Sequence, residues 1–349
     1  MRSAPNDSSR SVGSPMDRPP RRRFRGTAAG LATMLAAVAL AGATPASAQE
    51  DAESSADLSG ITIAYVDGLK GLPFFTSVHC GAQDRAAELG ITYQHDGPAQ
   101  FDATLQIPIL NAVAARNPDA IILSPTDTQA LIAPMQALVD RGTKLVTVDT
   151  TVEDPTLTAS RILSDNVGGG RLAADTIASL IGEKGPVVVI GVKPGISTTD
   201  ERGEGFAEAI AAYADIEFLG IEYNQGSDAT AQQVVTGVIS RRPDLAGIFI
   251  PGNVGSEGAA AALRSADLGD KVKVVQYDAS PPQVEQLRQG LFEALIAQDP
   301  YQEGREAVDQ AVAAILGEEN TPEVLTSLNV ITREGVDTEG PLYQYKVEC

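Results

Sequence analysis

The amino-acid sequence predicts an α/β fold with two doubly wound lobes, each built on a parallel sheet. Short runs of β-branched and aromatic residues alternate along the chain with stretches of helical periodicity, a pattern typical of parallel sheets covered by helices on both faces. Four such strand–helix units precede Asp149 and roughly four follow Ser164, which is more strands than one compact sheet in a chain of 349 residues usually holds. Two sheets, and therefore two lobes, are the economical arrangement.

Residues 1–48 carry the pattern of a secretory signal peptide and have no place in the predicted fold. An arginine cluster precedes an uncharged run from Gly26 to Ala43, and Ala46-Ser47-Ala48 matches an A-x-A cleavage site. The uncharged run is too short and too rich in Ala and Gly for a membrane anchor. We therefore expect export, with cleavage after Ala48 and an acidic linker over residues 49–59.

The start codon and the export route stay open. Met16 is an alternative start to Met1. Arg21–Phe24 fits the core of a twin-arginine signal, although Pro20 stands where a Ser or Thr is usual. The general secretory route is the alternative.

The charge of the exported chain argues against nucleic acid as a partner. The full sequence has 26 basic and 46 acidic side chains, and removing the seven Arg and two Asp of residues 1–48 leaves 19 and 44, a net charge of −25. Such a surface repels nucleic acid and anionic membranes. A solvated acidic coat that keeps an exported protein soluble explains the charge without a partner.

The first unit of the fold is a strand, a loop and a helix. Ile61–Val66 is rich in β-branched and aromatic residues and ends at a polar, Gly-containing turn, and helical periodicity runs from Pro73 until Gly90. In an open parallel sheet such a loop lies at the carboxyl ends of the strands, where ligands bind. We therefore place Phe74 and Phe75 at that edge, although a core position is an equal alternative for Phe75.

The remaining strands and helices repeat the same pattern. Two helical stripes, Ala231–Ile239 and Val308–Leu316, place their apolar residues on one face and belong to the core. We expect the break between the lobes at Thr150–Asn166, where polar residues and Pro155 interrupt the periodicity. The further predicted strands are Ile91–His95, Ala120–Leu123, Lys144–Val148, Pro186–Ile190, Ile216–Tyr223, Ala246–Ile250 and Val272–Tyr277.

The chain has two cysteines, Cys80 and Cys349, and export places them in an oxidising compartment. Cys80 lies about 200° around its helix from Val78, away from the apolar stripe, so we expect it to face outward where the chain terminus can reach it. We favour a disulfide that ties down the tail. Two unpaired thiols are the alternative.

The residues of common catalytic and cofactor sites are missing from this sequence. Its two histidines, His79 and His95, have no metal-ligating neighbour at useful spacing, so we expect no metal site. We find no nucleophile elbow, and the segment Gly191–Thr199 lacks the Gly-Lys-Ser/Thr ending of a phosphate loop. We therefore expect neither an enzyme nor a cofactor.

A polar residue recurs at the carboxyl end of most predicted strands. Together with Phe74 and Phe75, these residues describe a cleft for a small, hydroxyl-rich molecule, because aromatic faces cover C–H surface and carboxylates accept O–H donors. Each Asp taken singly is equally explained as a turn or cap residue. The strand-end residues are Asp67, Thr126, Asp127, Asp149, Thr150, Thr198–Arg202, Asn224, Asn253 and Asp278.

Six segments match a known family in the correct order. They are residues 71–90, 123–149, 164–175, 199–206, 274–281 and 294–304. The chain resembles the periplasmic sugar-binding proteins of the ribose and galactose type, which are type I periplasmic binding proteins that deliver solutes to ABC importers. The resemblance implies a periplasmic, monomeric protein with a membrane permease as its partner.

The resemblance also implies a hinge of three crossing segments, near Ser164, Gln298 and Leu328, that closes the lobes over the ligand. It places residues 60–164 with 299–328 in the N-terminal lobe. Residues 165–298 with 329–349 form the C-terminal lobe and tail.

The ligand-binding residues that the resemblance implies are Phe74, Phe75, Asp149, Arg202, Asn253 (or Gly252 beside it), Asp278 and Gln298. This chain departs from the ribose binders at several positions: Leu72 replaces an Asn, Thr150 and Asp200 replace arginines, and the third aromatic falls at Gly226 or Ser227. We expect Asp149, Asp200 and Asp278 to face one volume with only Lys70 and Arg202 nearby. A sugar or polyol is the leading ligand, because its O–H groups satisfy two carboxylates. A cationic or amino-bearing ligand is the alternative, with Phe74 available for a cation–π contact, and a sensory role for a chemoreceptor also stays open.

Overall fold

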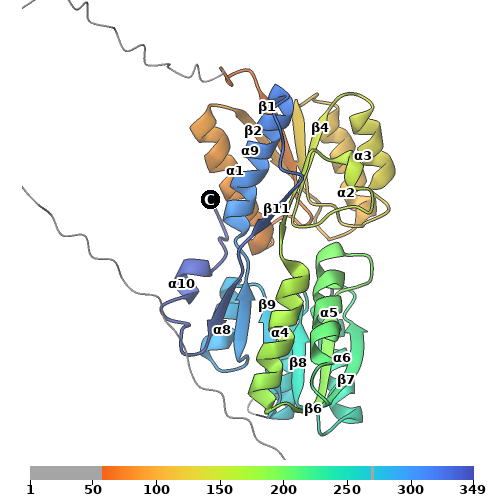
Figure 1. The fold of residues 1–349 in the computed structure, drawn as a ribbon, viewed down its shortest axis with the longest axis vertical. Helices are drawn as coiled ribbons and strands as arrows, with labels where there is room; N and C mark the ends of the chain where they lie inside the picture. The colour runs from red at the N-terminus through yellow and green to blue at the C-terminus, as the bar shows by residue number, and fades with distance from the viewer. Residues whose placement is uncertain (1–56, 269–270) are drawn as a thin grey trace, which may run out of the picture. The chain divides into compact units, whose positions relative to one another are not determined.

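A computed structural model describes residues 57–268 and 271–349 (Figure 1). The predicted signal peptide, its cleavage site after Ala48 and most of the predicted linker lie outside the described residues. Within the described ranges no helix combines the length and apolar character that crossing a membrane requires. These residues form two α/β lobes.

The N-terminal lobe contains a six-stranded, fully parallel sheet in the order β11-β5-β4-β3-β1-β2. Side chains alternate between its faces: Ile63 and Tyr65 face one core, whereas Ala64 and Val66 face the other. The strands are β1 (Thr62–Val66), β2 (Thr92–Asp96), β3 (Ala120–Leu123), β4 (Lys144–Val148), β5 (Ser160–Ser164) and β11 (Glu323–Thr326). The helices are α1 (Pro73–Leu89) and α9 (Pro300–Leu316), which pack together, and α2 (Ala103–Ala114) and α3 (Ile132–Val139), with the 3₁₀ turn η1 (Pro155–Leu157).

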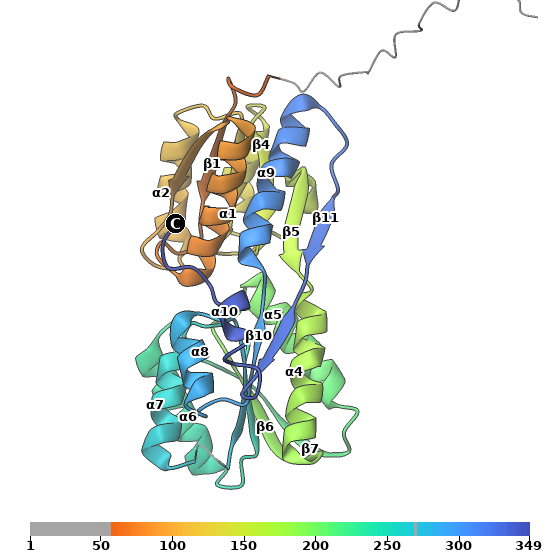
Figure 2. The same ribbon diagram turned by 90° about the vertical axis from the view of Figure 1, so that its left-hand side faces the viewer.

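The C-terminal lobe contains a second six-stranded sheet in the order β12-β10-β9-β8-β6-β7 (Figure 2). Five strands are parallel, but β12 pairs antiparallel with β10, so the prediction of purely parallel sheets is wrong at this edge. The strands are β6 (Lys184–Gly191), β7 (Asp215–Tyr223), β8 (Gly247–Ile250), β9 (Lys273–Tyr277), β10 (Ala294–Ala297) and β12 (Asn329–Thr332). The helices are α4 (Asn166–Ile181), α5 (Ser197–Ile210), α6 (Asp228–Arg241), α7 (Ser256–Ala266), α8 (Pro281–Arg288) and α10 (Gly340–Tyr343).

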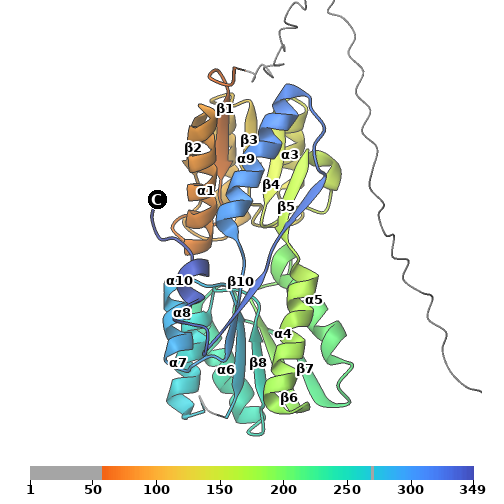
Figure 3. The same cartoon turned by 60° about the vertical axis from the view of Figure 1, so that its left-hand side comes forward.

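The chain passes between the sheets three times: after β5, between β10 and α9, and between β11 and β12 (Figure 3). The sequence analysis did not identify β5, β10, β11 or β12. The segment predicted as the break, residues 150–166, contains η1 and β5, and the passage to the second sheet lies at its far end. Pairing with neighbouring strands stabilises these short strands, and such pairing leaves no local period in the sequence.

Cys80 and Cys349 form a disulfide with a Cα–Cα distance of 5.3 Å, which confirms the predicted pairing. Cys80 is completely buried, so the prediction that it faces outward is wrong. The C-terminal tail lies along α1, where the backbone N–H of Lys346 donates to Ser77 Oγ at 2.6 Å. The tail therefore covers the face of α1 that carries Cys80, which lies outside the apolar stripe of that helix.

Candidate ligand-binding site

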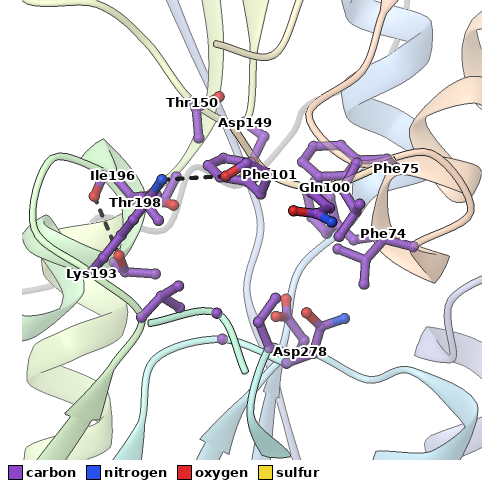
Figure 4. Close-up of a pocket in the computed structure, with 18 of the residues that line it drawn as sticks. Phe74, Phe75, Gln100, Phe101, Asp149, Thr150, Lys193, Ile196, Thr198 and Asp278 are labelled. Atoms are coloured by element: carbon purple, nitrogen blue, oxygen red, sulfur yellow. Dashed lines mark hydrogen bonds between the residues drawn. The ribbon is translucent and has the colours of Figure 1, made fainter. Parts of the chain in front are cut away.

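A cavity of about 510 Å³ lies between the carboxyl ends of the strands of the two sheets (Figure 4). Both lobes contribute to it, because each parallel sheet presents its strand-end loops to the same space. The polar and charged lining side chains are Gln100, Asp102, Asp149, Thr150, Lys193, Thr198, Thr199, Arg202, Gln225, Asn253, Asp278 and Gln298. Apolar surface comes from Leu69, Leu72, Phe74, Phe75, Phe101, Val192, Ile196 and Val254.

Two buried carboxyl groups, Asp149 and Asp278, face the cavity from opposite lobes (Figure 4). Burial raises the pKa of Asp149 to about 7, while Arg202 opposes this rise and Asp278 adds to it. Burial also raises the pKa of Asp278, against the effects of Arg202 and of hydrogen bonds from Gln298 and Tyr345. Both carboxyl groups need donors before they hold a full charge in this environment.

Arg202 on α5 is the buried cation of the site. Its guanidinium donates to Asn166 Oδ1, to the Pro251 carbonyl and to Gln298 Oε1, at 2.8 to 2.9 Å. The guanidinium carbon also lies 3.8 Å from the ring centroid of Tyr277. The planar group is therefore held in one orientation, with its charge between the two acids.

A short hydrogen-bonded chain joins Arg202 to Asp278. Gln298 accepts from Arg202 through Oε1 and donates from Nε2 to Asp278 Oδ1 at 2.6 Å. Gln298 lies between β10 and α9, at the second passage between the sheets. The orientation of Asp278 thus depends on a residue at that passage.

Three phenylalanines form the aromatic wall of the cavity. Phe74 meets Phe75 edge to face at a centroid distance of 5.3 Å, and Phe75 stacks on Phe101 at 6.3 Å. Pro73, in the first turn of α1, directs Phe74 and Phe75 to this edge. Gly68 lies under the wall, where a Cβ atom would meet the Phe101 and Phe75 rings at 2.6 and 2.8 Å.

The two lobes contact each other beside the cavity. Lys193 Nζ donates to the Phe101 carbonyl at 3.3 Å (Figure 4). Thr128 N donates to the Gly195 carbonyl at 3.3 Å, and Thr151 N donates to Ser197 Oγ at 3.1 Å. Each of these bonds joins the N-terminal lobe to the loop before α5 or to its first residue.

Residues 63–319 match the family model described as a periplasmic binding protein domain. The chain belongs to this family. It is 29% identical over 308 residues to the ribose import binding protein of Escherichia coli strain K12, a match that covers 87% of this chain and 98% of that protein.

Solved structures of similar proteins have the same fold. An ABC transporter solute binding protein from Agrobacterium vitis, bound with α-D-tagatopyranose, is 35% identical with a TM-score of 0.80, covering 82% of this chain and 99% of that one. A carbohydrate transporter solute binding protein from Agrobacterium radiobacter, in complex with D-arabinose, is 27% identical with a TM-score of 0.76, covering 81% and 98%. The family consists of binding proteins for transport and is not an enzyme family.

Eight of the ten ligand-binding residues predicted from the sequence line the cavity of this periplasmic binding protein: Phe74, Phe75, Asp149, Thr150, Arg202, Asn253, Asp278 and Gln298. Lys70 and Asp200 do not. The Lys70 ammonium pairs with Asp96 at 3.2 Å, on the surface. Asp200 Oδ2 accepts the Gly195 N–H at 2.8 Å, in the turn before α5. The expectation that Asp149, Asp200 and Asp278 face one volume is therefore wrong for Asp200, because this side chain caps a local turn.

Several lining residues were not predicted as ligand-binding residues, among them Gln100, Phe101, Asp102, Lys193 and Gln225. Gln100 and Phe101 follow β2, and Lys193 follows β6. The expectation of polar residues at strand ends extends to these loops, but Phe101 is aromatic and lies five residues beyond Asp96, the last residue of β2. Gly226, where the resemblance places a third aromatic, lines the cavity without a side chain, and Phe101 supplies the additional ring.

Proposed function

We propose that this periplasmic binding protein captures a neutral sugar or polyol between its lobes and delivers it to an ABC import permease. The balance of charge in the cavity carries this proposal. Two buried carboxyl groups, Asp149 and Asp278, face two cations, Arg202 and Lys193. The third acid of the lining, Asp102, is the N-cap of α2, where its Oδ1 accepts from Thr104 N and Oγ1. A neutral ligand with several O–H groups supplies donors to the acids and acceptors to the cations, without leaving an unpaired charge.

The alternative of a cationic or amino-bearing ligand loses its main support in this arrangement. It rested on Asp149, Asp200 and Asp278 in one volume, and Asp200 lies outside the cavity lining. Asp102 does line the cavity, but its carboxylate accepts hydrogen bonds from Thr104. Lys193 adds a positive charge that the sequence analysis did not place there. The phenylalanine wall suits the C–H face of a sugar ring and needs no cation.

A thermal-shift screen of the mature chain tests the proposal. The panel contains D-tagatose, D-ribose, D-arabinose, D-allose and D-fucose, with ribitol as a polyol and spermidine and choline as cations. A ligand at 100 times its dissociation constant adds about 2.7 kcal/mol to the free energy of unfolding. A stabilising sugar or polyol supports the proposal, whereas stabilisation by a cation alone contradicts it.

Export, monomeric state and the permease partnership are further parts of the proposal. The family and its import-binding relatives support export and the permease partnership, and the leader pattern of residues 1–48 supports export as well. The monomeric state rests on the resemblance to the sugar-binding proteins. Mass analysis of the exported chain should find Gln49 at its start, and light scattering should give one copy per particle. Vesicles that contain the neighbouring permease and ATPase should take up the sugar only when the binding protein is added.

A further inference from the structure

The last five residues of the chain touch both lobes. The backbone N–H of Tyr345 donates to the Ala279 carbonyl at 2.9 Å, in the loop after β9. The next residue, Lys346, donates from its N–H to Ser77 Oγ on α1 and places its ammonium 4.1 Å from the Tyr301 ring centroid on α9. A single peptide bond thus separates a contact with the C-terminal lobe from a contact with the N-terminal lobe.

The Tyr345 side chain is 3% exposed and contacts residues that line the ligand-binding cavity. Its hydroxyl donates to Asp278 Oδ1 at 3.0 Å and accepts the Gln298 N–H at 3.0 Å. Its ring meets the Phe74 ring edge to face at 5.7 Å. Tyr345 does not line the cavity. It contacts three residues that do: Asp278, Gln298 and Phe74.

Apart from Tyr345, the last five residues of the chain are exposed. Val347 is 64% exposed, and Lys346, Glu348 and Cys349 are also exposed. Chain ends of this kind fray unless they are tied down. The disulfide to Cys80, in the second turn of α1, is the covalent tie. Three residues lie between Tyr345 and Cys349, so the four Cα–Cα steps give a reach of at most about 14 Å.

We propose that Tyr345 is a positioning residue of the ligand-binding site, and that the Cys80–Cys349 disulfide holds it there by closing a fourth connection between the lobes. Tyr345 fixes which way the Asp278 carboxylate points and supplies it with a donor. The tail also limits how far the lobes separate on that side, since its reach is short. This inference concerns the ligand-free chain and does not depend on which sugar binds.

The titration of Asp278 in the ligand-free mature protein tests the role of Tyr345. Other groups that face Asp278 are Arg202 from α5, Asp149 from the end of β4 and Tyr277 on β9, and the Tyr345→Phe substitution leaves them in place. Loss of the donated hydrogen bond should raise the pKa of Asp278 above its value in the parent. The carboxyl resonance is followed by carbon-13 NMR and assigned by its disappearance in Asp278→Asn.

Tyr343→Phe is the matched control. Tyr343 lies two residues before Tyr345, at the end of α10, and among the described residues its hydroxyl makes no hydrogen bond. Its substitution should leave the Asp278 pKa unchanged. An unchanged pKa in Tyr345→Phe, or an equal rise in both variants, would overturn the positioning role.

Removal of the disulfide tests the tether. In the Cys80→Ser/Cys349→Ser variant, the Tyr345 amide should exchange its hydrogen faster and the Asp278 pKa should rise as in Tyr345→Phe. Small-angle scattering of the ligand-free variant should give a larger radius of gyration. A second variant keeps the disulfide and inserts Gly-Ser-Gly-Ser after Lys346, which lengthens the tether without removing the cross-link. Scattering and exchange that match the parent in both variants would refute the tether.

Discussion

Asp149 and Asp278 occupy equivalent positions in the two lobes. In the N-terminal lobe, β11 is the edge strand and Asp149 follows β4, the third strand from it; in the C-terminal lobe, β12 is the edge strand and Asp278 follows β9, the third strand from it. Each has a left-handed backbone, with φ of 66° and 77°, and each donates its N–H to the neighbouring strand, to Ile162 O and Ile296 O at 2.9 and 2.8 Å. Aspartate tolerates this conformation better than most residues. The two lobes therefore use one local structure to bring a carboxyl group to each side of the cavity.

The first prediction concerns these two acids. Asp149→Asn and Asp278→Asn should each weaken binding of the sugar found by the screen by about 1.5 to 3 kcal/mol, the contribution of hydrogen bonds to a charged group. Asparagine also tolerates a left-handed backbone, so the turns should persist. Titration calorimetry measures the loss.

Asp200→Asn is the control for this pair. Its side chain lies outside the cavity and its amide oxygen can still accept the Gly195 N–H, so affinity should match the parent. Two variants at Asp149 and Asp278 that bind as tightly as the parent would show that the site is elsewhere.

The second prediction concerns the pH dependence of binding. The pKa of Asp149 is raised to about 7 in the ligand-free chain, and a sugar hydroxyl that donates to this group favours its charged form. Affinity should therefore increase as pH rises from 6 to 8 and level off above that range. Calorimetry across this range checks the trend, and in Asp149→Asn the slope should flatten. A steeper slope in that variant would contradict the assignment.

The third prediction concerns Glu303, a buried residue at the start of α9. Ser164 Oγ and Thr326 Oγ1 both donate to its Oε1, at 2.9 and 3.0 Å, and Oε2 has no partner. These donors lie at the ends of β5 and β11, so one carboxyl group joins all three passages between the lobes. Burial raises its pKa to about 8, with Asp149 adding to the rise.

The folded chain therefore holds a proton on Glu303 that the unfolded chain releases near its ordinary pKa of 4.5. Stability contributed by this group is complete below that pH and is lost as pH rises toward 8, by up to about 1.4 kcal/mol per pH unit. Glu303→Gln keeps the acceptor and does not titrate. Denaturant unfolding at pH 5, 6.5 and 8 should show a smaller loss of stability in the variant, and parallel curves would rule the effect out.

The fourth prediction concerns Phe101. Phe101→Leu removes the ring that stacks on Phe75 but keeps an apolar side chain over Gly68. Binding of the sugar should weaken by about 0.5 to 1.5 kcal/mol, the scale of an aromatic contact beyond its buried area. The Lys193 bond to the backbone carbonyl of Phe101 remains possible. If the variant melts at the same temperature as the parent but binds the sugar more weakly, the loss comes from the ligand-binding site and not from reduced stability of the fold.

The sequence by itself determined the α/β class, the two lobes and most of the strands that carry the site; it favoured the disulfide, which the structure confirms. It also placed Asp149 and Asp278 at strand ends, and Phe74 at the edge of the sheet to which the carboxyl ends of the strands point. These features follow from local patterns: alternation of strand and helical periods, and a polar residue where a buried run stops. Parallel strands bring their carboxyl ends to one edge of the sheet whatever their order. The convergence of strand-end residues can therefore be predicted before any tertiary contact is known.

Only the tertiary structure decided which strand-end residues reach the cavity. Lys70 and Asp200 are close in sequence to residues that line the cavity, Leu69 and Thr199. Their side chains instead contact local partners, Asp96 and the Gly195 N–H. Phe101 and Tyr345 join the site from a loop and from the far end of the chain, through pairings across many residues that no local period encodes. A short polar side chain takes the nearest partner that satisfies it, and that partner is set by the packing of the whole chain.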